Sequence, residues 1–389
     1  METKGRGSLI SSDNDGSLEI SADELKSLYD DEERDFVVID VREPEEFRDW
    51  KIQGSMNVPL GERFASRVRA IADGNRVITV CRTGVRSLHA IDELAGTGLS
   101  VRSLRGGIVA WSNTCVSSEV QVPNAGPSKV IQIRRLSKGC TSYLIGDGKD
   151  CVVVDPSSRI EEYVRTARRE RLRITHVIDT HKHADHISGA RRLASSAGAH
   201  LHLSPMDSYY FDGYRPLVDS TSIGLESGRM EIKAIHTPGH TRGSMSLLVN
   251  DRMLLSGDTL LLDGVGRPDL QGSVEESARQ LFRTCEKLFD ELDSEAIVLP
   301  AHFGSNEDLM TTAPITAPVS IVEARIRKAD LSDPASIAGR VCNLPKPANY
   351  EAILKINSGQ ASFDPSVCDL LEEGPNRCAL ASEAPWGKP

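Results

Sequence analysis

The sequence predicts an α/β protein made of two domains in series. Its 389 residues are too many for one compact core, because a domain usually takes roughly 100–200 residues. Short β-branched runs alternate with helical segments over residues 18–118, which is typical of an α/β domain. After a break, residues 129–359 contain a longer series of strands with helices between them. We therefore expect an α/β domain followed by a second, two-layered mixed domain.

Each element of the first domain follows from a short run of residues with a clear preference. Strands are expected where β-branched and apolar residues cluster, at residues 36–40, 77–80 and 101–104. Helices are expected at residues 44–47 and 87–94. Two prolines and a glycine break the periodicity between residues 119 and 128, which predicts a linker there. Residues 1–17 have no apolar run and are expected to form a flexible N-terminus.

The second domain is predicted to be richer in strands. We expect strands at residues 130–133, 142–145, 151–154, 175–179, 201–203, 230–235, 244–249, 253–256 and 296–299. Helices are expected at residues 160–171 and 273–288, with further helical segments between residues 311 and 359. Residues 360–389 contain Asp-Pro, Gly-Pro and Ala-Pro steps, which predict a loosely packed C-terminal tail.

Composition and charge exclude several classes of function. The chain has 46 Lys+Arg against 56 Asp+Glu, a formal net charge of −10, so no chain-wide positive field can hold nucleic acid. It has neither a long apolar run nor an apolar segment near its start that would indicate a signal peptide. We therefore expect a cytoplasmic protein without a membrane partner. Its eight cysteines show no paired spacing, which predicts free thiols in a reducing compartment.

One cysteine stands at the junction of an apolar strand and a helix. Cys81 begins the six-residue loop Cys-Arg-Thr-Gly-Val-Arg, where backbone N–H groups and a helix N-terminus converge and stabilise an anion. With Arg82 and Arg86 nearby, Cys81 is expected to react as a thiolate nucleophile. Gly84 lets the loop close tightly. A ring of six residues suits a single terminal sulfur better than a tetrahedral phosphate, which favours sulfur transfer.

This loop resembles that of the rhodanese family of sulfurtransferases. The segments Ile39–Phe47, Gly54–Pro59 and Leu104–Trp111 extend the resemblance over about residues 18–115. In that family the loop cysteine carries a persulfide. The resemblance implies that Cys81 carries sulfane sulfur, that Arg86 and the loop amides cradle it, and that thiosulfate, sulfite and thiols are its small-molecule partners.

A dense group of histidines follows one predicted strand of the second domain. Residues Thr180–His186 place three imidazoles and a carboxylate within six positions, and three more candidate ligands stand on later turns or strand ends. Imidazole and carboxylate groups are common ligands of transition metals. The sequence therefore predicts a metal site. Its candidate ligands are His181, His183, Asp185, His186, His240, Asp258 and His302.

These residues resemble the metal site of the metallo-β-lactamase superfamily, over about residues 129–310. The resemblance implies a four-layer αββα sandwich with the metal at its mouth. The predicted fold is thus an N-terminal rhodanese-like α/β domain followed by an αββα metallo-β-lactamase-like sandwich.

Three segments are similar to the persulfide dioxygenases of that superfamily, also called sulfur dioxygenases. They are Cys140–Tyr143, Leu262–Gln271 and Asn343–Tyr350. The resemblance implies a dioxygenase of hydrogen sulfide metabolism that uses O2 to convert a thiol persulfide into sulfite and thiol. Phe303 and Gly304 replace an Asp-Tyr pair of many glutathione-using relatives. Glutathione, coenzyme A, another small thiol and a protein persulfide therefore remain open as the sulfur carrier.

The same resemblance implies roles for the candidate residues. One Fe(II) per chain would be held by His181, His240 and Asp258, the two-histidine, one-carboxylate set of non-haem iron oxygenases. The residues implied to orient these ligands are His183, Asp185, His186 and His302. The residues implied to contact the substrate are Arg267, Asp269, Tyr143 and Cys140, although Arg267 and Asp269 could equally form a structural ion pair.

A thiolester hydrolase of the glyoxalase II type resembles the same positions and is the main alternative. It would hold two Zn²⁺ ions and use bound hydroxide as its nucleophile. One zinc would take His181, His183 and His240, the other would take Asp185, His186 and His302, and Asp258 would bridge them. A sulfur-relay module without catalysis and a flavodiiron-type electron carrier are weaker alternatives, because the full ligand set is present and no flavin domain is. Homologous architecture indicates a homodimer or tetramer.

Overall fold

The computed structural model describes residues 17–31, 35–122, 129–136, 138–303, 313–329, 331, 333–341, 346, 349–374 and 377–381. The chain divides into two compact units. One comprises Met1–Phe47 and Gly54–Trp111, and the other comprises Arg48–Gln53 and Ser112–Pro389. No helix among the described residues is both long and apolar enough to cross a membrane.

The first unit is built on a five-stranded parallel sheet with the strand order β1-β5-β4-β2-β3. The strands are β1 (Glu19–Ile20), β2 (Phe36–Asp40), β3 (Met56–Asn57), β4 (Arg76–Val80) and β5 (Val101–Leu104). The helices are α1 (Ala22–Asp30), α2 (Pro44–Asp49), α3 (Phe64–Ala72), α4 (Val85–Glu93) and α5 (Gly107–Trp111). Because all strands are parallel, the loops that follow β2, β4 and β5 gather at one edge of the sheet.

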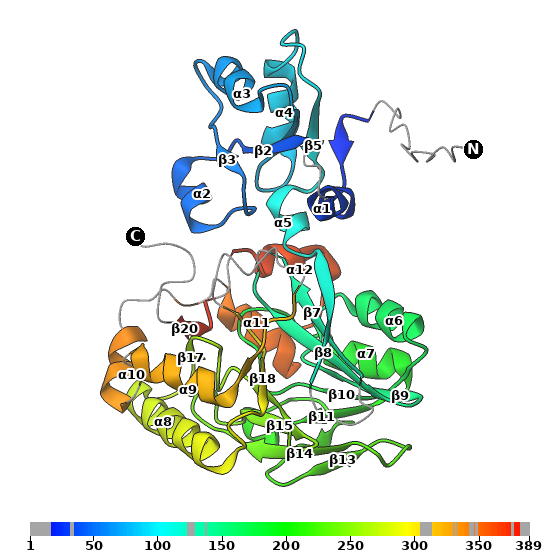
Figure 1. Ribbon diagram of the computed structural model, residues 1–389, viewed down its shortest axis with the longest axis vertical. Coiled ribbons are helices and arrows are strands. Elements are labelled where there is room, and N and C mark those ends of the chain that lie inside the picture. The colour runs from blue at the N-terminus through cyan, green and yellow to red at the C-terminus, as the bar shows by residue number, and fades with distance from the viewer. Residues whose placement is uncertain are drawn as a thin grey trace, which may run out of the picture. The chain divides into compact units, whose positions relative to one another are not determined.

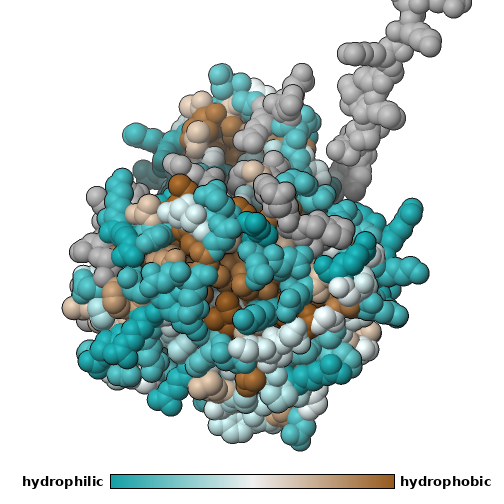
Figure 2. Space-filling view, turned by 60° about the horizontal axis from the view of Figure 1, so that its bottom comes forward, coloured by the Kyte–Doolittle hydropathy of each residue, from teal (hydrophilic) through white to brown (hydrophobic). Residues whose placement is uncertain are grey.

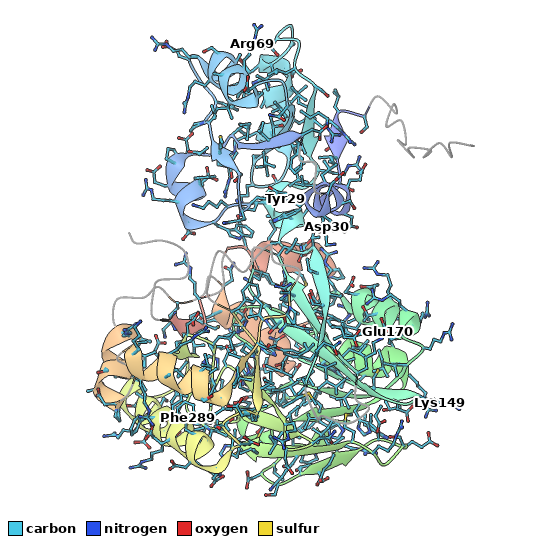
Figure 3. The ribbon with its side chains drawn as sticks, viewed as in Figure 1. Tyr29, Asp30, Arg69, Lys149, Glu170 and Phe289 are labelled. Atoms are coloured by element: carbon cyan, nitrogen blue, oxygen red, sulfur yellow. The ribbon has the colours of Figure 1, made fainter. Side chains whose placement is uncertain are left out.

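Side chains from the helices of this unit close the core around the sheet. Phe64 and Val68 of α3 and Ala90 of α4 are buried against residues of β2 and β4. On α1, Tyr29, labelled in Figure 3, packs its ring 5.2 Å from that of Phe36 and 5.6 Å from that of Trp111. The predicted α/β class of this domain is confirmed.

The second unit contains two large sheets (Figure 1). The seven-stranded sheet has the order β12-β11-β10-β9-β8-β7-β6, and the six-stranded sheet has the order β13-β14-β15-β16-β18-β19. The strands of the first are β6 (Cys115–Val120), β7 (Lys129–Arg135), β8 (Thr141–Asp147), β9 (Asp150–Val154), β10 (Arg173–Ile178), β11 (His200–Leu203) and β12 (Arg215–Pro216). Those of the second are β13 (Ser222–Gly224), β14 (Glu231–His236), β15 (Met245–Val249), β16 (Met253–Gly257), β18 (Ile297–Pro300) and β19 (Ala317–Pro318).

Three apolar layers hold this unit together as an αββα sandwich. The middle layer lies between the two sheets and joins, for example, Val152 of β9 to Leu247 of β15. A second layer packs α6 (Ile160–Arg169) and α7 (Ala190–Ala197) on the seven-stranded sheet. A third packs α8 (Val274–Glu291), α9 (Val319–Lys328) and α10 (Pro334–Val341) on the six-stranded sheet, with Phe289 of α8 (Figure 3) at its margin. The predicted four-layer architecture is confirmed.

Polar and charged side chains cover most of the face shown in Figure 2, and apolar side chains reach the surface near its middle. The large apolar side chains thus mainly fill the layers inside the units, as expected when burial of apolar surface drives folding.

The second unit starts earlier than the sequence indicates. Strand β6 pairs antiparallel with β7, so this unit begins at Ser112 and not at residue 129. The predicted first domain, which ended at residue 118, and the predicted linker at 119–128 both overlap this strand. The centre of β6 is the polar segment Ser117-Ser118-Glu119, so a prediction that looks for apolar runs does not find this edge strand. Residues 123–128 of the predicted linker lie outside the described part.

The C-terminal segment is packed rather than loose, contrary to the prediction for residues 360–389. After α11 (Tyr350–Ser358) it forms α12 (Pro365–Leu371) and β20 (Ala379–Ala381), which pairs with β17 (Gly264–Gly266). Within it Glu372 and Cys378 are fully buried. The Asp364-Pro365 step stands at the start of α12, and Cys368 and Cys378 contribute to small apolar clusters. Residues 375–376 and 382–389 lie outside the described part.

Candidate metal centre and cysteine loop

The loop that begins at Cys81 directs hydrogen-bond donors at the cysteine sulfur. Cys81 directly follows β4, and Gly84 caps the N-terminus of α4 in the left-handed region at φ 98°. The buried Sγ of Cys81 accepts a hydrogen bond from the Gly84 N–H at 3.2 Å and another from the Ser87 hydroxyl at 3.5 Å. A Cβ atom on Gly107 would lie 2.3 Å from the Cys81 carbonyl oxygen, so only glycine fits beside this loop.

Arg86 has a partner that the sequence did not indicate. Its guanidinium donates to both carboxylate oxygens of Glu46 on α2, at 2.7 and 2.8 Å. This hydrogen bonding lowers the pKa of Glu46 to about 2 and raises the pKa of Arg86, with Cys81 making a smaller electrostatic contribution to the latter. Arg82 is exposed on the same loop. The cradle around Cys81 is therefore formed mainly by the loop amide and the Ser87 hydroxyl, while Arg86 stands beside it as half of an ion pair.

Three side chains from separate strand ends of the second unit meet at one point. His181 lies just after β10, His240 lies on the turn between β14 and β15, and Asp258 follows β16. Oδ2 of Asp258 lies 3.4 Å from Nε2 of His240 and 3.7 Å from Nε2 of His181, and one ligand atom of each residue lies within 4.8 Å of the others. All three side chains are buried.

The atoms that converge at this point have no hydrogen-bond partner in the described part of the chain. Among the described residues, Nε2 of His181, Nε2 of His240 and Oδ2 of Asp258 have no partner. Unsatisfied polar atoms are rare in a protein interior and need an explanation. A metal ion in their midst would satisfy all three, so the chemistry of the site fits a bound metal.

The opposite atoms of the two histidines are fixed. Nδ1 of His240 donates to the Arg267 carbonyl oxygen at 2.8 Å, and Nδ1 of His181 lies 3.0 Å from the Thr180 hydroxyl. Gly266 makes the first contact possible, because a Cβ atom there would lie 2.2 Å from the Asp258 carbonyl oxygen and 2.8 Å from Nδ1 of His240. These outer contacts turn both Nε2 atoms inward.

The protonation states suit metal binding. Burial lowers the pKa of His181 and of His240, so both imidazoles are neutral at pH 7 and offer a lone pair. Burial raises the pKa of Asp258, but the neighbouring His302 lowers it by more, so Asp258 is a carboxylate.

A second cluster lies beside the first and contains Cys140, Asp185, His186 and His302. Asp185 joins it together: one oxygen lies 3.1 Å from Nδ1 of His186, and the other lies 3.0 Å from Nε2 of His302 and accepts from the Cys140 thiol at 3.2 Å. Nδ1 of His302 lies 2.5 Å from Asp258. The predicted orienting residues Asp185 and His302 thus connect to the ligand candidates through hydrogen bonds.

The His183 ring packs 4.2 Å from the rings of both His181 and His186, but its Nε2 atom points to a different group of residues. Its Nε2 lies 3.3 Å from Asp155 and 4.0 Å from Asp179, and these three residues form a separate buried group. Asp155 also accepts two hydrogen bonds from Thr180, at 2.7 and 2.9 Å. The sequence analysis did not single out Asp155 or Asp179, although each stands at the end of a predicted strand, where such residues gather.

Among the residues predicted to contact substrate, Cys140 lies in the second cluster but Tyr143 does not. Tyr143 is buried in the apolar layer between the sheets, and its hydroxyl donates to the Pro300 carbonyl oxygen at 2.7 Å. Cys140 lies just before β8 and bridges to His302, whereas Tyr143 lies within the strand, so the two side chains reach different surroundings. Arg267 and Asp269 form a bidentate ion pair at 2.6 and 2.8 Å, which matches the structural alternative. The segment Asn343–Pro347 lies outside the described residues except for Lys346.

The C-terminal segment supplies two residues that sequence reasoning missed. Glu372 accepts from the Ile187 N–H at 2.7 Å and pairs with the buried Arg135 of β7. Asn357 donates to the carbonyl oxygens of His183 and His186, both at 2.9 Å, and accepts from the Ser188 N–H. Both residues therefore hold the loop that carries the histidine motif. No local pattern marks them, because their partners lie far away in the sequence.

Comparison with known proteins identifies both parts of the chain. The model of the metallo-β-lactamase superfamily matches residues 138–302, and that of the rhodanese-like domain matches residues 21–114. The chain is a rhodanese-like domain joined to a domain of the metallo-β-lactamase superfamily. An uncharacterized protein of Mycobacterium leprae, ML0493, is 32% identical over 193 residues, which cover 43% of this chain and 87% of that protein.

The metallo-β-lactamase domain is also similar to persulfide dioxygenases. The human mitochondrial persulfide dioxygenase ETHE1 is 32% identical over 171 residues, 42% of this chain and 64% of that protein, so the match spans just under two thirds of its length. Among solved structures, ETHE1 from Myxococcus xanthus aligns with a TM-score of 0.50 and 25% identity, over 59% of this chain and 97% of that one. A metallo-β-lactamase from Staphylococcus aureus aligns with a TM-score of 0.52 and 25% identity, over 65% and 75%.

Proposed function

We propose that the metallo-β-lactamase domain is an iron-dependent persulfide dioxygenase. The overall reaction is R–S–SH + O2 + H2O → R–SH + SO3²⁻ + 2 H⁺, with a small thiol persulfide such as glutathione persulfide as substrate. The observation that carries the proposal is the convergence of three unpartnered, buried atoms from two histidines and one aspartate. The similarity to persulfide dioxygenases supports it.

His181, His240 and Asp258 would hold one Fe(II), which when bound supplies open positions where a persulfide sulfur and O2 can meet. The chain's own part is to hold these ligands in place through Arg267, Thr180 and His302. Burial strengthens the interactions between charged groups in the site. Burial alone lowers the pKa of His302, but the nearby carboxylates of Asp258 and Asp185 raise that pKa well above its usual value, so His302 holds a proton between them.

The placement of His183 counts against the two-zinc hydrolase. That alternative needs Nε2 of His183 to join the Nε2 atoms of His181 and His240 at one metal, whereas it lies 3.3 Å from Asp155 and 4.0 Å from Asp179. Three protein ligands on a single metal suit the dioxygenase better.

The experiment that tests the dioxygenase is oxygen uptake by iron-loaded protein given glutathione persulfide, with sulfite measured in the same vessel and metal content measured beforehand. We expect about one iron per chain and one sulfite per O2 consumed. Two zinc ions per chain, with thiolester hydrolysis and no oxygen uptake, would contradict the proposal.

We further propose that the rhodanese-like domain transfers sulfane sulfur through Cys81. The balanced step is Cys81–S⁻ + S2O3²⁻ → Cys81–S–S⁻ + SO3²⁻, in which the S–S bond of thiosulfate breaks and a new one forms on Cys81. The persulfide then passes to a small thiol. In reverse, the step turns sulfite made by the other domain into thiosulfate. The hydrogen bonds to Sγ of Cys81 support an anionic sulfur at this place.

Replacement of this cysteine should separate the two activities. Cys81→Ser is expected to reduce thiosulfate:thiol sulfur transfer to the uncatalysed level, because serine cannot carry a persulfide. Oxygen uptake from added glutathione persulfide should remain. Cys115→Ser, at a partly buried cysteine of the other unit, is the matched control. Loss of both activities in a folded Cys81→Ser protein would contradict the assignment of two separate sites.

A further inference from the structure

A cavity of about 810 Å³ lies in the second unit, between α7 and the end of α11, and none of the three metal-ligand candidates lines it. Its volume is that of a site for a small molecule. One wall is a face of α7 with Arg191, Arg192 and Ser195 at helical spacing, continued by Ser188 just before the helix. Ile187 and Leu203, both buried, contribute apolar surface.

Two arginines of this wall lie over aromatic rings. The guanidinium carbon of Arg191 lies 4.3 Å from the centre of the Phe211 ring, and that of Arg192 lies 4.1 Å from the centre of the Phe363 ring. All four residues line the cavity. Stacking of this kind restricts the flexible arginine side chains and leaves their N–H groups available in the plane of each head.

Neither guanidinium has its charge neutralised nearby. Among the described residues no carboxylate forms an ion pair with Arg191 or Arg192, unlike Arg159, Arg173 and Arg229, which pair with acidic side chains. Arg192 donates one hydrogen bond, to the Ser158 carbonyl oxygen at 3.0 Å. The cavity therefore carries two positive charges on one wall with donors to spare.

The single carboxylate among the described lining residues is Asp179. It is buried, one of its oxygens accepts from the Ser188 hydroxyl at 2.6 Å, and the other has no hydrogen-bond partner among the described residues. The carboxylate of Asp179 repels the charged end of an anionic ligand. Such a ligand would place its anionic group beside Arg191 and Arg192 and its uncharged end toward Asp179 and the apolar lining.

We propose that this cavity binds a small molecule that carries a carboxylate or phosphate on an aromatic or other apolar body. The planar guanidinium heads match the oxygens of such anions, which they bind through paired hydrogen bonds. The rings of Tyr209, Phe211 and Phe363 and the side chains of Ile187 and Leu203 accept the body. This inference is independent of the chemistry proposed for the metal centre and for Cys81.

The test is isothermal titration calorimetry of the full chain with three probes: phenyl phosphate, benzoate and benzyl alcohol. We expect the two anions to bind at one site per chain and the alcohol to bind at least tenfold more weakly. Tighter binding of phenyl phosphate identifies a phosphate ligand, and tighter binding of benzoate identifies a carboxylate. Equal affinity for the alcohol and the anions, or no binding of any probe, overturns the proposal.

Variants assign the binding to this cavity. Arg191→Gln and Arg192→Gln should each weaken the binding of the preferred anion about tenfold, because each removes a charge-assisted pair of hydrogen bonds. Arg191→Lys, which keeps the charge but not the planar head, should fall between Arg191→Gln and the unaltered protein. Arg168→Gln, at an exposed arginine of α6 that does not line the cavity, is the control. Equal affinities in Arg191→Gln, Arg192→Gln and Arg168→Gln would exclude this site.

Discussion

His240→Ala is expected to remove both bound iron and oxygen uptake. His240 supplies one of three protein ligands, and its Nε2 lies 3.4 Å from Asp258 with no other partner among the described residues. Loss of a residue that merely orients a ligand already costs about 10–100-fold in metal affinity, so loss of a ligand should cost at least about 100-fold. The imidazole ring is buried, and its removal leaves a space in the site that water can enter.

The measurement is iron content by elemental analysis after gel filtration, together with oxygen uptake. His200→Ala, at an exposed histidine of β11, is the matched control and should keep both. Sulfur transfer by Cys81 should persist in both variants. An His240→Ala protein that binds iron and consumes oxygen as the unaltered protein does would mean that the metal lies elsewhere.

Glu372→Gln should destabilise the second unit by about 3–5 kcal/mol, the usual cost of removing one partner of a buried ion pair. Glu372 and Arg135 are 2% and 3% exposed, so the change leaves a guanidinium charge buried without a counter-charge. The remaining hydrogen bonds of Arg135, to Asn113 at 2.7 Å and to the Ser112 carbonyl oxygen at 3.2 Å, bring no negative charge. The glutamine amide can still accept from Ile187, so the loss is mainly electrostatic.

The free energy of unfolding is measured by urea titration followed by circular dichroism. Asp369→Asn is the matched control, because Asp369 forms a similar pair with Arg159 at the surface, where both side chains are more than a third exposed. Such a pair contributes about 0–1 kcal/mol. If the two substitutions lowered the free energy of unfolding equally, the buried Glu372–Arg135 pair would contribute no more to stability than the surface pair.

The ligand candidates could be predicted because each of them lies in a short segment with recognisable metal-binding residue types. The motif at residues 181–186 and the isolated His240, Asp258 and His302 each stand after a strand or on a turn, and the fold gathers six of these seven candidates into two groups, while His183 lies in a third. His181 follows β10 of the seven-stranded sheet, whereas His240, Asp258 and His302 follow strands of the six-stranded sheet, so the group forms where strand ends of the two packed sheets meet. Cys81 was predictable for the same reason, because one loop carries all its neighbours in the cradle.

Contacts between distant segments could not be predicted. Glu46 and Arg86 are 40 positions apart, and Glu372 and Ile187 are 185 positions apart. Which rotamer a histidine adopts is equally hidden: His183 belongs to the same motif as His181 but faces Asp155. The edge strand β6 was not predicted, because only one of its faces is buried and its sequence therefore resembles that of a linker.

The hydrogen bonds from Asn357 to the carbonyl oxygens of His183 and His186 have a consequence for the order of assembly. They join residues 174 and 171 positions apart. A chain made from its N-terminus releases the rhodanese-like unit first, and domains generally fold as they emerge. The histidine loop, by contrast, reaches its final contacts only after α11 and Glu372 have left the ribosome. We therefore expect the cysteine loop to be complete early in synthesis, whereas the histidine loop can make its final contacts only after Asn357 and Glu372 have been made.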